Sequence, residues 1–226
     1  MANRSKRYRQ ARAEVDRKER YSLGKAIDIV RSMPGADFDE TVEVAIQLGI
    51  DPRQTDQQVR TSLSLPHGTG KEVRVIVFAE GDDAEAAREA GADEVGSDDL
   101  VERIEDGWMD FDVALATPKM MSKVGRLGRY LGPRGLMPTP KNGTVRDDIG
   151  DAVEEFKAGK VELRNDDGGN VHVPVGKLSF ADEQLQENVQ AVMEQLTRQK
   201  PPGATGRFFR NVVISSTMSP GVKLSI

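Results

Sequence analysis

Cysteine is absent from the 226 residues of this chain. Its absence excludes disulfide bonds, thiolate catalysis and zinc sites built on cysteine. Aromatic residues make up only 5% of the sequence and hydrophobic residues 37%, which is lean but sufficient for small packed cores. No apolar run approaches the roughly 20 residues of a membrane-spanning helix, and no apolar stretch follows the basic N-terminus as in a secretory signal. We therefore expect a cytoplasmic protein without a membrane partner.

Catalytic and metal-binding constellations are also missing from the sequence. The two histidines, His67 and His172, have no neighbouring partners at ligand spacing, and no serine lies in a nucleophile elbow. The stretch around Gly70-Lys71 resembles a phosphate-binding loop, but Leu65 replaces the first glycine of that motif and Glu72 replaces its Ser or Thr. The sequence therefore predicts no catalytic residue, no metal and no cofactor, and hence no enzyme.

The formal net charge of -5 conceals an uneven distribution along the chain. Residues 80–112 contain fourteen acids and two bases, whereas no acid follows Glu194. The first thirteen residues contain no acid and five bases, namely Arg4, Lys6, Arg7, Arg9 and Arg12. Such asymmetry indicates a polyanionic partner, with the acidic part facing away from it, whereas ordinary helix-surface charge is the alternative and the better interpretation of residues 80–112.

The longest acid-free basic run lies within residues 118–146, called here the basic segment. It contains seven positive side chains: Lys119, Lys123, Arg126, Arg129, Arg134, Lys141 and Arg146. Glycine and proline recur every few residues, so the sequence indicates a loop whose backbone can approach a ligand closely. We expect this loop to meet phosphate; the alternative is a solvated connection between two elements.

The hydrophobic pattern changes twice along the chain. The first part of the chain predicts a helix over 23–31, with Ser22 at its N-cap. It also predicts two strands from alternating apolar and polar residues, over 41–46 and 59–65. The middle alternates between strands and helices, which is typical of a parallel sheet covered by helices. The elements expected there are strands over 73–78, 94–95 and 111–116 and helices over 83–90 and 98–106.

The last third returns to amphipathic elements. We expect helices over 149–157 and 182–198, a β-hairpin of strands 160–165 and 169–175, and a final strand over 208–215. The predicted fold class is α+β and α/β: a discontinuous two-layer α+β domain (1–66 and 159–226) and an inserted Rossmann-like three-layer α/β domain (67–158). The two crossings between the domains should lie side by side as a double hinge.

Four hydroxyl side chains and no charge follow the last expected strand, in the stretch Ser215–Gly221. Hydroxyls and free backbone amides at a strand end can hydrogen-bond RNA sugars and bases. An ordinary polar turn is the alternative interpretation of the same residues.

The basic segment carries a resemblance to a known family. GRLGRYLGPRGLMPTPKNGTV (Gly125–Val145) closely resembles the signature of the family of large-subunit ribosomal protein one, the L-one stalk protein of bacteria. The similarity extends over nearly the whole chain in the family's order, through FDETVEVAIQLGID (Phe38–Asp51), SLPHGTGK (Ser64–Lys71), GWMDFDVALATP (Gly107–Pro118), FKAGKVELRND (Phe156–Asp166), VGKLSF (Val175–Phe180) and SSTM (Ser215–Met218).

The resemblance implies a non-enzymatic protein that binds large-subunit rRNA in the mobile stalk and helps to release deacylated tRNA from the exit site. It also implies repression of translation through the protein's own operon mRNA, and a monomer when free. A free RNA-binding translational regulator remains an alternative, and a Rossmann-like nucleotide-binding enzyme is a second one. Sequence alone does not separate the first alternative from a ribosomal protein, because both would use one RNA surface.

The family's RNA contacts correspond to particular residues of this chain. The resemblance assigns the main contact to the discontinuous domain, through Phe38, Thr41, Glu43, Thr217, Met218 and Ser219. It assigns secondary contacts to the inserted domain, through Arg126, Arg129, Arg134 and Lys141. The chain departs from the family at two positions: Asp37, directly before Phe38, where lysine is common, and Ser219, where glycine is common.

Overall fold

A computed structural model describes residues 5–16 and 18–225 of the chain; Arg4 of the basic N-terminus lies outside the described residues. The chain divides into two compact units. We call Met1–Gly70 with Val161–Ile226 the terminal unit, and Lys71–Lys160 the inserted unit. The sequence places the crossings after residues 66 and 158, and the two units divide slightly later in the chain, after residues 70 and 160.

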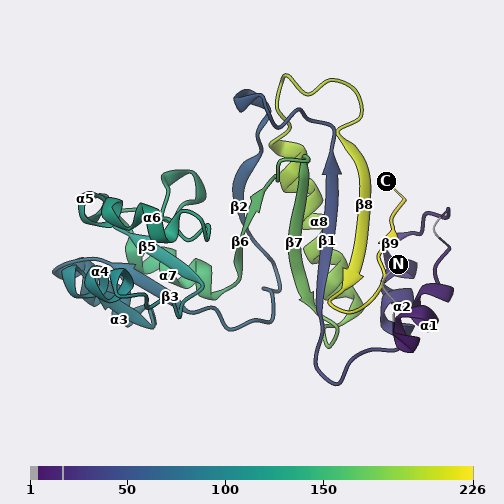
Figure 1. Cartoon of the computed structure of the whole chain (residues 1–226), viewed down its shortest axis with the longest axis horizontal. Helices are drawn as coiled ribbons and strands as arrows, with labels where there is room; N and C mark the ends of the chain where they lie inside the picture. The colour runs from purple at the N-terminus through teal and green to yellow at the C-terminus, as the bar shows by residue number, and fades with distance from the viewer. Residues whose placement is uncertain (1–4, 17, 226) are drawn as a thin grey trace. The chain divides into compact units, whose positions relative to one another are not determined.

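The terminal unit is built on a four-stranded sheet in the order β7-β1-β8-β9 (Figure 1). The central strand β1 (Thr41–Leu48) pairs antiparallel with β7 (Asn170–Lys177) and with β8 (Phe209–Ser216), and the short β9 (Val222–Lys223) adds the edge. Burial alternates along β1, with Val42 buried and Glu43 half exposed, and so on to Leu48. One face of the sheet is therefore core, and the other is open.

Two helices cover the buried face of this sheet. They are α2 (Leu23–Ser32) and α8 (Asp182–Arg198), which pack against each other and against β8 and β7 respectively. The apolar residues of α8 recur at helical spacing and are buried, as the sequence predicts. A short helix that the sequence pattern does not predict, α1 (Lys6–Ala13), begins at Ser5, whose hydroxyl accepts a hydrogen bond from the Tyr8 N–H at 3.2 Å.

The expected hairpin over 160–175 is wrong, although both of its strands exist. β6 (Lys160–Arg164) pairs with β2 (Arg60–Ser64) in a separate two-stranded sheet, whereas β7 pairs with β1. Only an isolated bridge joins Asn165 to Val171. The turn itself does form, because the Asp166 carboxylate accepts hydrogen bonds from the backbone N–H groups of Gly168 and Asn170. Turn chemistry is local, but the choice of a partner strand is a tertiary property.

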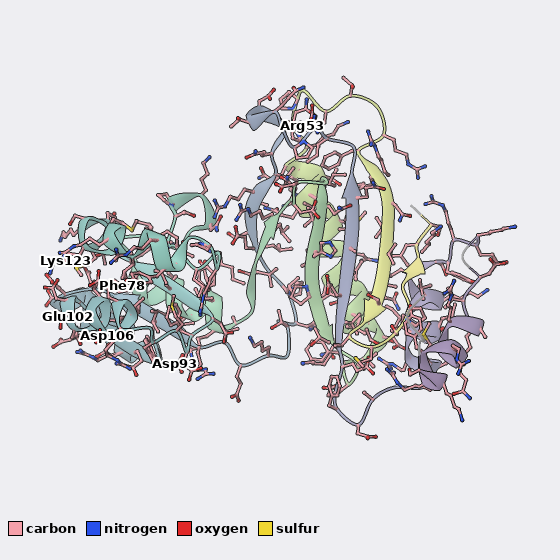
Figure 2. The ribbon with its side chains drawn as sticks, in the orientation of Figure 1. Arg53, Phe78, Asp93, Glu102, Asp106 and Lys123 are labelled. Atoms are coloured by element: carbon pink, nitrogen blue, oxygen red, sulfur yellow. The ribbon has the colours of Figure 1, made fainter. Side chains whose placement is uncertain are left out.

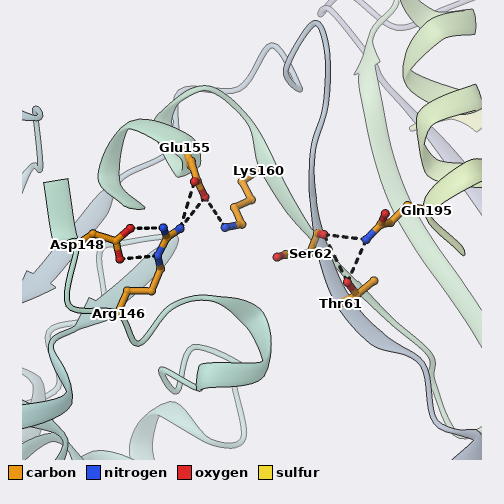
Figure 3. A network of polar contacts seen from close by, with 7 residues as sticks. All are labelled: Thr61, Ser62, Arg146, Asp148, Glu155, Lys160 and Gln195. Atoms are coloured by element: carbon orange, nitrogen blue, oxygen red, sulfur yellow. Dashed lines mark hydrogen bonds and ion pairs between the residues drawn. The ribbon is translucent and has the colours of Figure 1, made fainter. Parts of the chain in front are cut away.

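One side chain of α8 also forms hydrogen bonds with β2. The Gln195 side-chain amide donates to the Thr61 hydroxyl at 3.3 Å and to the Ser62 carbonyl at 3.5 Å (Figure 3). A single 3-10 turn, η1 (Thr55–Gln57), precedes β2.

The inserted unit contains a parallel three-stranded sheet in the order β4-β3-β5. Its elements are β3 (Val75–Phe78), β4 (Glu94–Gly96) and β5 (Val113–Ala116), with the helices α3 (Asp82–Glu89), α4 (Asp98–Glu105) and α7 (Ile149–Lys157). All residues of β3 are buried, and one apolar cluster packs on each face of the sheet. The mixed fold class predicted from the sequence is thus confirmed.

The basic segment is folded rather than an open loop, which corrects the expectation from its glycines and prolines. It forms a series of short helical turns: η2 (Pro118–Met120), α5 (Met121–Val124), η3 (Gly125–Leu127), α6 (Gly128–Leu131) and η4 (Pro140–Asn142). Four apolar side chains, spaced three or four residues apart, anchor these turns in the core: Met120, Val124, Leu127 and Leu131. The packing leaves the intervening cations at the surface. Nowhere in the described chain is a helix both long and apolar enough to cross a membrane.

Candidate nucleic-acid interface

Two large apolar side chains of the terminal unit, Phe38 and Met218, are exposed. Phe38 is 55% exposed and Met218 44%, and the described residues contain no other large hydrophobic side chain in that class. Phe38 precedes β1 and Met218 follows β8. Because Val42 pairs with Ser216 in the antiparallel ladder, these two segments meet at one end of the sheet. We call Phe38, Thr41, Glu43, Thr217, Met218 and Ser219 the sheet-end site.

Reciprocal hydrogen bonds join Thr41 to Thr217 in this site. The Thr41 N–H donates to the Thr217 hydroxyl at 3.1 Å, and the Thr217 N–H donates to the Thr41 carbonyl at 3.0 Å. The Lys177 ammonium group donates to the Thr41 hydroxyl at 2.9 Å and brings a positive charge to the site. Sequence reasoning missed Lys177, because only the pairing of β7 with β1 places it there.

Glu43 lies on the open face of the sheet. Its carboxylate is 2.8 Å from His172 Nδ1 on the neighbouring strand, and the two side chains are 45% and 56% exposed. The carboxylate has two oxygens with several acceptor positions, so it retains capacity to accept further hydrogen bonds. His172 is a surface residue, as expected from its sequence context.

Ser219 closes the turn that follows β8. Its hydroxyl accepts from the Ser216 N–H at 2.8 Å, and its own N–H donates to the Ser216 carbonyl at 3.2 Å. Among the described residues only glycines have positive φ, so the backbone at position 219 needs no glycine. The serine therefore fits the turn and adds a hydrogen bond to it. Asp37, the second departure from the family, is exposed.

A buried carboxylate behind the sheet-end site also escaped sequence reasoning. Glu40 is 1% exposed and accepts hydrogen bonds from the Ala36 N–H at 2.8 Å, the Ser216 hydroxyl at 2.5 Å and the Met218 N–H at 2.9 Å. Burial raises the pKa of Glu40, but these three hydrogen bonds and the positive charge of Arg7 outweigh it, and the net shift is downward. Glu40 is therefore ionised at neutral pH.

Some cations of the basic segment form ion pairs within the inserted unit, and others are exposed to solvent. Lys123 donates to Glu80 at 2.7 Å and to Asp98 at 2.8 Å, and it is labelled in Figure 2. Arg146 lies between Asp148 and Glu155, and Lys160 bonds Glu155 from the other side (Figure 3). These ion pairs raise the pKa of Lys123 and of Arg146, because they favour the charged forms.

The four residues expected to make secondary contacts are not among the cations with internal ion pairs. All of them are exposed, and within residues 5–16 and 18–225 none forms an ion pair: Arg126, Arg129, Arg134 and Lys141. The Arg129 guanidinium lies 4.8 Å from the ring centre of Tyr130, an arrangement that leaves its charge at the surface. No group of three or more His, Cys, Asp or Glu side chains in the described chain could hold a metal ion.

Comparison with known proteins adds a second line of evidence. Residues 30–220 match the ribosomal protein L1p/L10e family. The chain is 55% identical over 224 residues to the large ribosomal subunit protein uL1 of Kosmotoga olearia, covering 99% of this chain and 97% of that protein. It is 54% identical over 226 residues to uL1 of Thermosipho melanesiensis (100% and 97% covered) and 55% identical over 221 residues to uL1 of Cutibacterium acnes (98% and 95% covered).

Proposed function

The chain belongs to the ribosomal protein L1p/L10e family, and from this premise we propose that it binds large-subunit rRNA through the sheet-end site. As a family member it is a ribosomal protein of the large subunit in the cytoplasmic ribosome, and the family is structural rather than enzymatic. The proposal therefore concerns which surface meets RNA, which groups recognise it and what the binding achieves.

The exposure of Phe38 and Met218 at the sheet end is the observation that carries the proposal. They are the two exposed large hydrophobic side chains of the described residues, and both lie on segments that meet at one sheet end, where clustered apolar exposure is typical of an interaction site. An aromatic ring beside hydroxyl and carboxylate groups suits unstacked RNA, whose bases stack on aromatic side chains and whose 2′-hydroxyls both donate and accept. Phe38 is the stacking group, and Glu43 accepts from a 2′-hydroxyl or a base edge.

The threonine and methionine of the turn have more restricted roles. The Thr217 oxygen already accepts from the Thr41 N–H, while its hydrogen faces the Thr41 carbonyl only at a long 3.4 Å. That hydrogen is the group free to turn toward RNA. The Met218 N–H is committed to Glu40, so Met218 contributes its side chain rather than its amide.

The inserted unit supplies a second kind of contact in this proposal. The exposed, unpaired cations Arg126, Arg129, Arg134 and Lys141 meet phosphates, which strengthens binding without reading sequence. We further propose that the protein forms the mobile stalk, assists release of deacylated tRNA from the exit site, and represses translation by binding its own operon mRNA at the same surface. Family resemblance supports these three roles.

Binding to a stalk-rRNA fragment, with a scrambled RNA as control, tests the proposal. Phe38→Ala and Thr217→Val should each weaken binding to the fragment by about 1–3 kcal/mol, roughly 5- to 150-fold. Thr205→Val removes an exposed hydroxyl from the loop that precedes β8, at the opposite end of that strand, and should leave the affinity unchanged. Equal, weak attachment of the unaltered protein to both RNAs would refute the proposal.

A further inference from the structure

Glu40 is unusual among the buried residues because it carries a charge. The other buried polar side chains in the described part of the chain are hydroxyls and amides: Thr69, Thr117, Asn142, Asn188 and Ser216. Burying a carboxylate is unfavourable unless hydrogen bonds replace the water that it loses. The donors that surround Glu40 therefore show what this buried charge does for the protein.

The two carboxylate oxygens of Glu40 bind two different segments. Oε1 accepts from the Ala36 N–H in the segment that carries Phe38, and Oε2 accepts from the Ser216 hydroxyl and the Met218 N–H in the turn after β8. The backbone carbonyl of Glu40 additionally accepts from the Leu178 N–H at 2.9 Å. One side chain thus joins the Phe38 segment to the Met218 turn, just beyond the last paired residues of β1 and β8.

Arg7 connects the same two segments from outside. Its guanidinium donates to the Pro34 carbonyl at 3.0 Å and to the Met218 carbonyl at 3.4 Å. The basic N-terminal run therefore contributes at least one residue to the framework of the site. The Arg7 charge also favours an ionised Glu40.

The chemistry of the network requires a carboxylate. All three groups that face the Glu40 oxygens are donors, and an ionised carboxylate only accepts. A glutamine of the same shape would direct its NH2 group at either the Ala36 N–H or the Met218 N–H, so at least one of the hydrogen bonds that hold the two segments in place would be lost.

We propose that Glu40 is a positioning residue for RNA recognition: it fixes Phe38 and Met218 on one surface without touching RNA itself. This inference rests on the proposed function of the sheet-end site. A side chain that is 1% exposed has no surface for RNA, so its effect must pass through the residues that it holds. The β1–β8 ladder continues from Val42 to Leu48 without it, so the sheet does not depend on Glu40 alone.

Glu40→Gln tests this inference, with Glu162→Gln as its matched control. Glu162 is a partly exposed carboxylate on β6 that pairs with Arg60, and it lies outside the network. Glu40→Gln should weaken binding to the stalk-rRNA fragment about tenfold, the effect of losing one hydrogen bond to a charged group. Its salt dependence should not change, because no phosphate contact is removed. The control should bind within about twofold of the unaltered protein.

A double-mutant cycle separates positioning from a purely structural role. If Glu40 acts through Phe38, then Phe38→Ala should weaken binding by a smaller factor in the Glu40→Gln protein than in the unaltered one. Amide exchange should accelerate at Ala36 and Met218 in Glu40→Gln, while the paired residues of β1 stay protected. Unchanged affinity despite accelerated exchange would overturn the inference, as would equal factors in the two backgrounds.

Two further outcomes are covered by the same experiment. If Glu40→Gln does not fold, Ser216→Ala removes one donor and keeps the carboxylate; it should bind about threefold more weakly, and undiminished binding would overturn the inference. If the unaltered protein shows no preference for the fragment, the proposed function fails and this inference with it. A clear preference that Glu40→Gln leaves intact refutes only the inference.

Discussion

Replacing both Arg126 and Arg134 with glutamine should flatten the salt dependence of RNA binding while leaving the preference for the stalk-rRNA fragment intact. Both side chains are exposed and unpaired, so both are available to phosphate. Each cation that neutralises a phosphate contributes about 0.7–0.9 to the slope of log K against log salt. The double variant should therefore lose about 1.4–1.8 from that slope. Between about 50 mM and about 200 mM salt, this amounts to about a tenfold difference in affinity loss.

Lys123 provides the matched control for this prediction because it belongs to the same segment and has the same charge. Its ammonium group pairs with the Glu80 and Asp98 carboxylates, whose negative charges offset its own and oppose the approach of a phosphate. Lys123→Gln should leave the slope unchanged. Counting positive residues in the sequence would instead assign all seven cations of the segment the same effect.

The assay is a fluorescence titration of the labelled rRNA fragment at five salt concentrations, repeated with the scrambled RNA. The double variant should approach the unaltered protein in affinity as salt rises, and discrimination between the two RNAs should persist throughout. An equal loss of slope in Lys123→Gln and in the arginine pair would refute this division of the cations. Loss of discrimination in the double variant would refute it too, because the inserted unit would then be the part that recognises the RNA structure.

Three further predictions concern the scaffold. Leu127→Ala should lower the free energy of unfolding of the inserted unit by about 2–5 kcal/mol in urea titrations, because Leu127 is fully buried under the basic segment. Asn188→Leu should destabilise the terminal unit by about 2 kcal/mol or more in the same assay, because Asn188 is wholly buried and bonds the Gly68 carbonyl, the Val175 carbonyl and the His67 N–H. The hydrogen bond from Lys160, and then that from Arg146, lower the pKa of Glu155, so its stabilisation of the inserted unit is complete above the ordinary carboxyl pKa and is lost as pH falls through the lowered value. Melting curves between about pH 7 and about pH 3 should show a smaller acid-induced drop for Arg146→Met than for the unaltered protein.

The sequence predicts most of the elements whose buried face appears as a regular spacing of apolar residues. The bounds of α7 and α8 are those expected, since each helix carries a continuous apolar stripe between clear boundary residues. Alternation likewise predicts β1 and β2, and short apolar runs predict β3 and β5. The pairing of β6 is not predicted, because the turn over 165–169 has the local chemistry of a hairpin while the hydrogen bonds of β6 go to β2, nearly a hundred residues away in the chain.

The basic segment differs from its predicted open loop for another physical reason. Glycine at positions 125, 128 and 132 lowers helix propensity and suggested an open loop. The apolar residues before and between those glycines nevertheless recur at helical spacing, and tertiary burial of that stripe outweighs propensity. Attention to Met120, Val124, Leu127 and Leu131 rather than to the glycines would have predicted the turns.

Some residues of the sheet-end site can be predicted from the sequence, and others cannot. Family resemblance identifies Phe38 and Thr217, and the antiparallel pairing of β1 with β8 explains why residues so distant in the chain share one surface. Nothing in the stretch Asp37–Thr41 distinguishes Glu40 from its exposed acidic neighbours, because burial there depends on a turn that the chain completes only at residue 219. Two of the three partners of the Glu40 carboxylate are backbone N–H groups, which leave no complementary residue type in the sequence. Only the folded structure distinguishes Glu40 from its neighbours, so mutagenesis of this surface should begin with Glu40 and continue with the residues that it holds.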